Sequence, residues 1–304
     1  MPDLILADVV AALERLYPPD TAMEWDRVGL VTGDLAQPVR LVHLAVDPTL
    51  AVIEEAVAAG ADLLITHHPL LLRGVSSVAT TTTKGETVTR AILADLALYC
   101  AHTNADLASP GVCDALGAAC GLETMQPLGL GPDAVGRLGD LPFPLALRAF
   151  VEQLATALPP TAGGVRVSGD ADALVSRVAV VGGSGDDRFA AVRAAGADVY
   201  VTADLRHHPV LEEREQSRYG RPYLVDAGHW ASEWVWLATV ERALLDEFGI
   251  VPRTEPEEVD GGSTRLDTWV STLRTEPWSF VVGANAVAPL PSPRLNTAPP
   301  GGTP

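Results

Sequence analysis

Short apolar runs followed directly by polar, ligand-type residues are the dominant pattern of this chain. Residues 63–65 form one such run, typical of a buried strand, and His67 and His68 follow where that strand should end. Adjacent residues on an extended chain point to opposite sides, so two neighbouring imidazoles can serve two neighbouring targets. Pro69 disfavours helical geometry at His68, which predicts a stiff turn. In open α/β sheets, ligands bind beyond the carboxyl ends of the strands, where we expect this pair to lie.

Apolar residues at helical spacing alternate with short β-rich runs in the first half of the chain. This pattern predicts helices over residues 8–17, 48–59, 86–97, 110–121 and 145–157, and strands over residues 41–46, 63–65 and 98–101. The last of these strands ends in a second group of ligand-type residues, which includes His102 and Asp106.

The second half of the chain repeats the first. Residues 195–202 match residues 59–66 almost position for position, and a His-His-Pro sequence follows each copy, displaced by four residues in the second. Further elements are predicted as a helix over 187–195, one long helix that ends near residue 248, and strands over 178–181, 223–225 and 266–273. Alternating strands and helices predict parallel sheets with right-handed crossovers. We therefore expect an α/β fold with two similar, internally duplicated lobes, mainly parallel sheets and a cleft between the lobes.

These elements divide the chain into four parts. We predict a first α/β lobe over residues 1–123, a connector over residues 124–175 and a second α/β lobe over residues 176–283. Residues 284–304 are mostly Pro, Ala, Gly and Thr without periodicity, which predicts a disordered tail.

Composition and charge narrow the classes of function. The chain has 304 residues, of which 47% are hydrophobic, and a formal net charge of −18. This charge argues against non-specific binding to nucleic acid or to an anionic membrane surface, because both need an excess of Lys and Arg. Anionic substrates remain compatible with it, because bound divalent cations can dominate the local charge of a site.

Cysteine usage and the N-terminus predict a cytoplasmic protein. Cys100, Cys113 and Cys120 form no C-x-x-C pair, and a sparse, odd set favours buried thiols in a reducing compartment over disulfides. The first residues lack the basic region of a secretory signal. No stretch reaches the roughly 20 apolar residues that a membrane span needs.

Five residues at predicted strand ends are candidate metal ligands: His67, His68, Asp106, His229 and Glu233. His229 and Glu233 are four apart at the start of a predicted helix, so both project from one face. Three imidazoles and two carboxylates without a thiolate suit two divalent ions, such as Zn, Fe, Mn, Co or Ni. Glu233 could bridge the two ions, which lie roughly 3.5–4 Å apart in two-metal sites. The residues alone leave the alternative of scattered structural histidines open.

The combination of these motifs is similar to one known family. Three motifs together resemble the signatures of the dinuclear-metal-centre hexameric proteins, also called NIF-three-like proteins or GTP cyclohydrolase type 2 homologues: residues 65–69, residues 102–106, and residues 226–229 with Glu233. Residues 25–30 and 182–185 fit the same family. The resemblance extends from about residue 4 to residue 280.

The resemblance implies a fold, a ligand set and an assembly. It places the metal ligands on the five candidates named above, and it implies two similar α/β lobes in a toroidal homohexamer whose metal sites face a central cavity. The sequence departs from the family at two places. Arg27 stands where the family usually has Asn, which makes the role of that loop uncertain. The large domain that some relatives carry between the lobes is absent, because residues 123–175 are too few to hold it.

Other histidines near predicted strand ends have open roles. His102 is our candidate catalytic residue, either as a proton carrier or as a support for a ligand, and a structural histidine is an equally favoured alternative. His207, His208 and Asp204 lie at the matching strand end of the second lobe, where His208 could line the cleft.

The glycine-rich stretch 182–185 joins a predicted strand to a predicted helix. Such a stretch could hold an anion at the helix N-terminus. However, it lacks the Lys-Ser/Thr of a P-loop, and Asp186 and Asp187 would repel phosphate. A plain tight turn is therefore favoured.

Two functions are consistent with these residues. The first is a metal-dependent hydrolase of a nucleotide or of another small phosphate-bearing or heterocyclic compound, in which the ions deprotonate a water and polarise the bond attacked. The second is a non-catalytic metal-binding assembly or interaction protein. Expected partners are further copies of the chain and a small-molecule substrate, whereas nothing indicates nucleic acid or membrane. A hydrolase needs a metal position open to water, which the sequence does not reveal.

Overall fold

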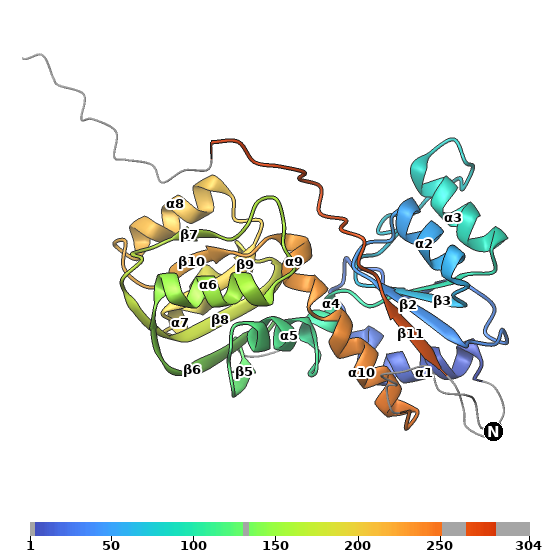
Figure 1. Ribbon diagram of the computed structural model, residues 1–304, viewed down its shortest axis with the longest axis horizontal. Coiled ribbons are helices and arrows are strands. Elements are labelled where there is room, and N and C mark those ends of the chain that lie inside the picture. Colours follow the sequence, from blue (N-terminus) through green and yellow to red (C-terminus); the bar gives the residue numbers. More distant parts are fainter. Residues whose placement is uncertain (1–3, 130–133, 251–265, 284–304) are drawn as a thin grey trace, which may run out of the picture.

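Two β-sheets, one in each of two lobes, organise the chain (Figure 1). The computed structural model describes residues 4–129, 134–250 and 266–283. The strands of the first sheet are, in spatial order, β1 (Gly29–Thr32), β4 (Ala97–Cys100), β3 (Leu63–Thr66), β2 (Leu41–Ala45) and β11 (Asp267–Val270). Strands β4, β3, β2 and β11 run parallel, and β1 pairs with β4 in the antiparallel direction.

The second sheet has a parallel centre and antiparallel edges. Its strands are, in spatial order, β5 (Met125–Pro127), β6 (Arg137–Ala146), β8 (Leu174–Ser184), β9 (Val199–Ala203), β10 (Tyr223–Asp226) and β7 (Arg166–Ser168). Strands β8, β9 and β10 are parallel, whereas β5, β6 and β7 pair in the antiparallel direction. Strands β5, β6 and β7, which lie within the predicted connector over residues 124–175, belong to this sheet. The predicted α/β fold with two mainly parallel lobes is confirmed.

Helices cover both faces of the first sheet. Helices α2 (Leu50–Ala59) and α3 (Thr83–Leu93) share a hydrophobic cluster with Leu64 of β3. On the other face, α1 (Leu6–Leu16) and α10 (Leu237–Glu247) share a cluster with Leu63 and Ile65. Successive residues of a strand point to opposite faces, so β3 needs an unbroken apolar run to be buried on both.

The second sheet is covered in the same way. Helix α6 (Leu147–Ala157) belongs to the cluster that contains Val178 and Val199, while α7 (Phe189–Ala194) packs with Tyr200 and Leu224. Helix α8 (His207–Gln216) follows β9 and lies beside the same lobe (Figure 1).

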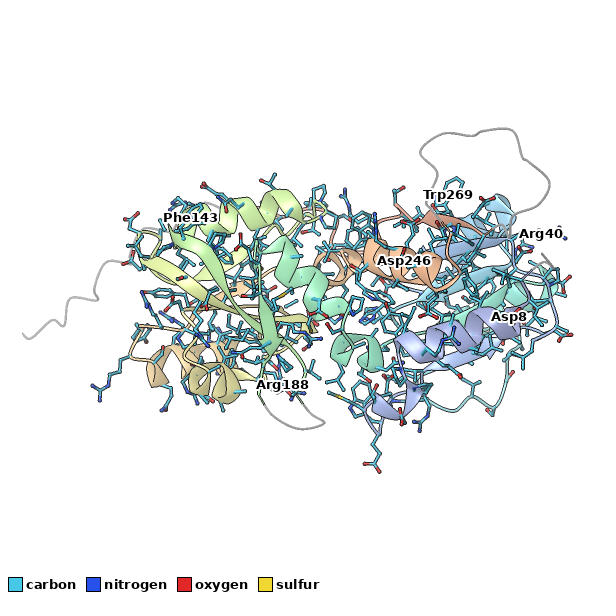
Figure 2. The ribbon with its side chains drawn as sticks, turned by 90° about the horizontal axis from the view of Figure 1, so that it is seen from below. Asp8, Arg40, Phe143, Arg188, Asp246 and Trp269 are labelled. Carbon is cyan, nitrogen blue, oxygen red and sulfur yellow. The ribbon has the colours of Figure 1, made fainter. Side chains whose placement is uncertain are left out.

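The chain crosses between the lobes at two pairs of helices. Helix α4 (Thr103–Leu107) follows β4 of the first sheet and leads to α5 (Val112–Ala119), which packs on β8 of the second sheet. Helix α9 (His229–Trp234) follows β10 of the second sheet and leads to α10, which packs on α1 of the first lobe. In Figure 2, Phe143 and Arg188 of the second lobe lie on one side of Asp246 of α10. Arg40, at the far end of the first lobe, lies on the other side.

The internal duplication is visible in one side-chain contact that occurs in both lobes. The Asp62 carboxylate, just before β3, accepts hydrogen bonds from the backbone N–H groups of Arg40 and Leu41 at 2.7 and 3.0 Å. The equivalent Asp198, just before β9, accepts from Ser176 and Arg177 at 2.8 and 3.0 Å. Each aspartate therefore fixes the neighbouring strand in the same register.

Two sequence predictions about local structure were wrong. The single long helix after β10 is interrupted at Trp236, whose fully buried side chain packs edge-on against Tyr17 and His67 at centroid distances of 5.6 and 5.4 Å. The chain changes lobes at this point. The stretch 182–185 is not a tight turn after a strand, because β8 continues through Ser184.

Three further predictions concern membrane helices, the cysteines and the C-terminal tail. No helix within the described ranges is long and apolar enough to cross a membrane. Cys100, Cys113 and Cys120 are free and buried, as the sparse cysteine pattern predicted. The predicted disordered tail, residues 284–304, lies outside the described residues.

We expect Arg137→Met to destabilise the fold strongly. Arg137 is 4% exposed, pairs with Asp114 at 2.6 Å, and donates to the carbonyl oxygens of Leu107 and Ala108 at the end of α4. Removing one partner of a buried ion pair leaves the other charge without compensation, which costs about 3 kcal/mol or more. Urea denaturation of the metal-free protein measures this loss.

Arg15→Met is the matched control for this prediction. The Arg15–Glu247 ion pair, at 2.7 Å, has an arginine side chain that is 59% exposed. Its loss should cost less than about 1 kcal/mol. Equal losses in the two variants would contradict a structural role for the buried pair.

Candidate metal centre

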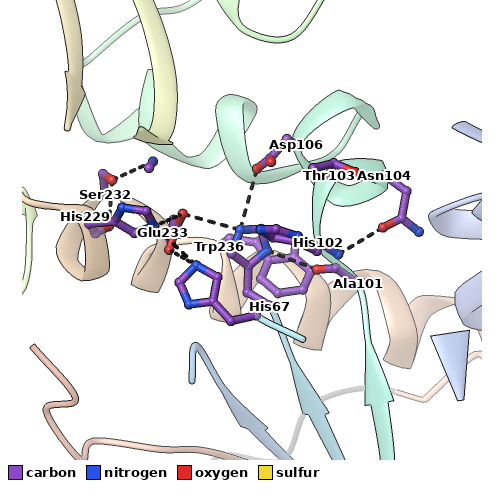
Figure 3. A network of polar contacts seen from close by, with 12 residues as sticks. His67, Ala101, His102, Thr103, Asn104, Asp106, His229, Ser232, Glu233 and Trp236 are labelled. Atoms are coloured by element: carbon purple, nitrogen blue, oxygen red, sulfur yellow. Dashed lines mark hydrogen bonds and ion pairs between the residues drawn. The ribbon is translucent and has the colours of Figure 1, made fainter. Parts of the chain in front are cut away.

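The carboxyl ends of the parallel strands of both sheets face one another, and polar side chains gather between them (Figure 3). Strand β3 is followed by His67 and His68, and β4 is followed by α4 with Asp106. From the other lobe, β10 is followed by α9 with His229 and Glu233. The structure thus brings all five predicted ligand residues together, and both inter-lobe crossings carry some of them.

His67 is completely buried at the centre of the group. Its Nδ1 lies 3.0 Å from the Ala101 carbonyl oxygen, which can only accept, so Nδ1 carries the proton and donates. Its Nε2 therefore presents a lone pair to Glu233 Oε1 at 3.5 Å and to Asp106 Oδ1 at 3.7 Å.

His68 and His229 are each oriented by a carboxylate. The Nδ1 of His68 lies 2.7 Å from Asp47 Oδ1, and the Nδ1 of His229 lies 2.8 Å from Asp204 Oδ2. Both rings therefore point Nε2 towards Glu233, at 3.1 and 3.0 Å, and the two Nε2 atoms are 3.2 Å apart. A carboxylate on the outer nitrogen fixes the tautomer and raises the basicity of an imidazole ligand.

His102 stands beside the first two histidines. Its Nδ1 is 2.9 Å from Oδ1 of Asp26, whose other oxygen accepts from the backbone and the hydroxyl of Thr103. The ring lies 5.1 Å from that of His67 and 5.5 Å from that of His68. Burial would raise the pKa of Asp26, but the bonds from His102 and Thr103 outweigh it and hold this pKa below its usual range.

Two overlapping groups of ligand atoms are present. One nitrogen of each of His67, His68 and His102 lies within 4.8 Å of the others, and the same holds for the ligand atoms of His68, His229 and Glu233. His68 belongs to both groups. Two ions could therefore be held side by side, and His102 could act either as a ligand or, with its Nε2 free of the ions, in the roles predicted for it.

Some ligand atoms of the site are buried and form no hydrogen bond with the residues that the structure describes, and this shows whether the site fits a metal ion. Within the described part of the chain, neither His67 Nε2 nor Asp106 Oδ1 has a hydrogen-bond partner, although both are shielded from solvent. Leaving a buried polar atom without a partner costs about 1–3 kcal/mol of folding free energy, so buried polar atoms normally have one. Where no hydrogen bond supplies the partner, a metal ion can. Imidazole nitrogen and carboxylate oxygen are the donors that Zn, Mn, Fe, Co and Ni accept, and the residues therefore fit divalent ions.

The charges of the site agree with this interpretation. Burial would lower the pKa of His68 and His229, but Glu233, together with Asp47 for His68 and Asp204 for His229, outweighs it and raises these pKa values to about 10 and about 11. Burial would raise the pKa of Glu233, but the three histidines hold it well below its usual range. Burial and the nearby Glu233 raise the pKa of Asp106. In the metal-free protein, protons on His68 and His229 thus balance Glu233, and a divalent ion must displace them, so metal binding weakens as pH falls.

The backbone of Gly183 passes directly beside Glu233. A Cβ atom at this position would lie 2.2 Å from Glu233 Oε1 and 3.2 Å from His229 Nε2, and the residue has φ +63°. The Gly183 N–H donates to Ser232 Oγ at 3.0 Å, and its carbonyl accepts from Thr202 Oγ1 at 2.9 Å, so this backbone cannot move away. The glycine-rich stretch therefore makes room for the carboxylate.

Sequence reasoning named Asp204 at a strand end, but it missed that Asp204 and Asp47 orient the ligands. Asp47 follows β2 and Asp204 follows β9, so the rule that located the ligands at strand ends could also have located them. Asp204 also occupies the position that His68 has in the first copy of the repeat. His207 and His208 contact each other at the start of α8 and are exposed, away from the ligand groups.

We expect Gly183→Ala to abolish or strongly weaken metal binding. Its Cβ would collide with the Glu233 carboxylate, whereas Gly196→Ala, at φ +67°, would meet no atom within 4 Å. Both variants carry a similar backbone strain of about 1–2 kcal/mol. Metal content after reloading, measured by mass spectrometry, should fall only for Gly183→Ala. Equal metal content in the two variants would show that the close approach does not matter.

Comparisons with known proteins identify the family to which the chain belongs. The family model Duf34/NIF3 (NGG1p interacting factor 3) matches residues 4–253. A Streptomyces coelicolor protein named GTP cyclohydrolase 1 type 2 homolog is 45% identical over 285 residues, which cover 92% of this chain and 98% of that protein. A Mycobacterium bovis protein of the same name is 35% identical over 385 aligned residues, which cover 90% and 97%. That alignment is longer than the 304 residues of this chain, so the relative has segments that this chain lacks.

Solved structures have the same fold. A Bacillus cereus protein related to NIF3 superimposes with a TM-score of 0.79 at 24% identity, covering 92% of this chain and all (100%) of that one. A Staphylococcus aureus hypothetical protein gives a TM-score of 0.79 at 25% identity with the same coverage, 92% and 100%. The resemblance inferred from the motifs is confirmed. The chain belongs to the Duf34/NIF3 (NGG1p interacting factor 3) family.

Proposed function

We propose that this protein is a hydrolase that depends on two divalent ions and acts on a nucleotide or a similar heterocyclic phosphate compound. The observation that carries the proposal is the convergence of His67, His68, Asp106, His229 and Glu233, with three of their ligand atoms buried without a hydrogen-bond partner among the described residues. The names of the relatives, GTP cyclohydrolase 1 type 2 homolog, are compatible with such chemistry.

Each residue has a distinct task in this proposal. Bound divalent ions supply a water of lowered pKa and polarise the bond that is attacked. Glu233, which contacts three histidines, would hold both ions, with Asp106 and the Nε2 atoms of His67, His68 and His229 as further ligands. His102, with its Nδ1 held by Asp26, can accept a proton at Nε2 and return it to the leaving group.

An exposed tryptophan beside the site favours a planar substrate. The indole of Trp25 is 54% exposed and lies edge-on to His102 at a centroid distance of 5.9 Å. Asp26 anchors this loop to α4, and the edge-on contact with His102 places the indole beside the ligand residues. Stacking of a base on such a ring is worth about 1–3 kcal/mol. Arg27, also exposed, adds a positive charge that suits a phosphate.

Metal stoichiometry is the first test. We expect two divalent ions per chain after removal and replacement of metal, because five N/O ligands exceed the needs of one four-coordinate ion. Glu233→Gln should lower both occupancies, and His229→Ala should empty mainly one. His208→Ala, which changes an exposed histidine, should keep both ions. One ion or fewer in the fully loaded wild-type protein would contradict the dinuclear proposal.

A substrate screen on the same preparations tests the activity. Hydrolysis of nucleotides or phosphoesters should require added metal and stop with chelator. Trp25→Ala should raise KM about tenfold if a base stacks there, whereas Trp269→Ala, at a similarly exposed residue of β11 (Figure 2), should not. If loaded protein hydrolyses none of these compounds, the metal-binding interaction protein becomes the better proposal.

We further propose that the chain assembles with copies of itself, as a homohexamer. The family resemblance supports this assembly, and the exposed apolar side chains Trp278, Phe280 and Val282 are compatible with an interface. Light scattering at micromolar concentration should give about six times the mass of the chain. A monomer would contradict the assembly, whereas a stable dimer would leave the metal proposal intact.

A further inference from the structure

The segment after β11 is anchored on both sides of the metal centre. Ser271 is 2% exposed, and its hydroxyl donates to Glu55 Oε2 of α2 at 2.6 Å. The Ser271 carbonyl oxygen accepts from Trp234 Nε1 at 3.0 Å, and Trp234 belongs to α9, the helix that carries His229 and Glu233. The start of this segment is therefore fixed to one helix of each lobe.

Four residues later, the same segment reaches the carboxylate that orients His68. The Thr275 hydroxyl donates to Asp47 Oδ2 at 2.5 Å, while Asp47 Oδ1 lies 2.7 Å from His68 Nδ1. The two oxygens of Asp47 are thus divided between the C-terminal segment and a ligand residue. Thr275 itself touches no ligand atom of the centre.

Because Asp47 has a partner at each oxygen, its carboxylate is fixed in orientation. The last torsion of an aspartate side chain is broad, so a carboxylate held at one oxygen alone can rotate and carry its partner with it. A second donor at the other oxygen fixes the plane of the carboxylate. Because His68 belongs to both ligand groups, a change in its ring orientation affects both ions at once.

We propose that Thr275 is a positioning residue of the metal centre, which fixes Asp47 and through it the imidazole of His68. The family model ends at residue 253, so in this chain the centre is supported by a segment that lies beyond the matched region. The inference rests on the metal binding that we propose above. Loss of such a supporting contact typically weakens metal affinity by about 10–100-fold.

Thr275→Val in the full chain tests the inference, with cobalt(II) as the probe. The variant keeps the shape of the side chain and removes its hydroxyl. We expect cobalt to bind about tenfold more weakly to the metal-free protein in calorimetry. The visible absorption spectrum of the bound cobalt should also change, which a general loss of stability would not cause. Thr275→Ser, which retains the hydroxyl, should restore both.

Thr268→Val is the matched control. The Thr268 hydroxyl also donates to a carboxylate, Glu241 Oε1 at 2.6 Å, but from β11, which precedes this segment. Cobalt binding as tight as in the wild type, or equal weakening in Thr275→Val and Thr268→Val, would overturn the inference. A wild-type chain that binds no cobalt would overturn the proposed metal centre as well, so the two failures are distinguishable.

Discussion

The candidate metal centre depends on one repeated interaction. In each of its four histidines, the Nδ1–H group donates a hydrogen bond to an oxygen on the side of the ring that faces away from the centre. The Ala101 carbonyl serves His67, and the carboxylates of Asp47, Asp26 and Asp204 serve His68, His102 and His229. Each ring therefore turns its Nε2 inwards, where lone pairs and carboxylates would repel one another without protons or cations between them. The oxygens behind the rings lie at the ends of β2, β4 and β9 or in the loop before β1, so both sheets must be in place before the centre exists.

The two lobes contribute unequally to this arrangement although their scaffolds are alike. Asp62 and Asp198 fix strand register by the same contact. After the equivalent strands, however, the first lobe has His67 and His68, whereas the second has Ala203 and Asp204. The duplicated scaffold has thus been kept while the residues at the strand ends differ. The first lobe supplies mainly nitrogen, and the second supplies Glu233 and one more imidazole.

Much of this could be predicted from the sequence, because buried parallel strands leave a strong local pattern. The apolar run before His67 and His68, and the spacing of His229 and Glu233, located residues that the fold brings together. The same rule could locate Asp47 at a strand end, but it could not pair Asp47 with His68. An aspartate after a strand looks the same in the sequence whether it faces solvent or a histidine 21 residues away. Pairing of β11 with the first sheet was equally inaccessible, since it joins residues more than 200 positions apart.

The crossing of the chain at α4 and α9 has a mechanical consequence. Asp106 and Glu233 leave the two crossings from opposite lobes, yet both approach Nε2 of His67, at 3.7 and 3.5 Å. A hinge rotation of one lobe against the other would change the separation between Glu233, which follows β10 of the second sheet, and His67, which follows β3 of the first. Trp236, wedged between His67 and Tyr17 at the second crossing, opposes that rotation by filling the space it would need. The distances between the ligand atoms therefore depend on the angle between the two lobes.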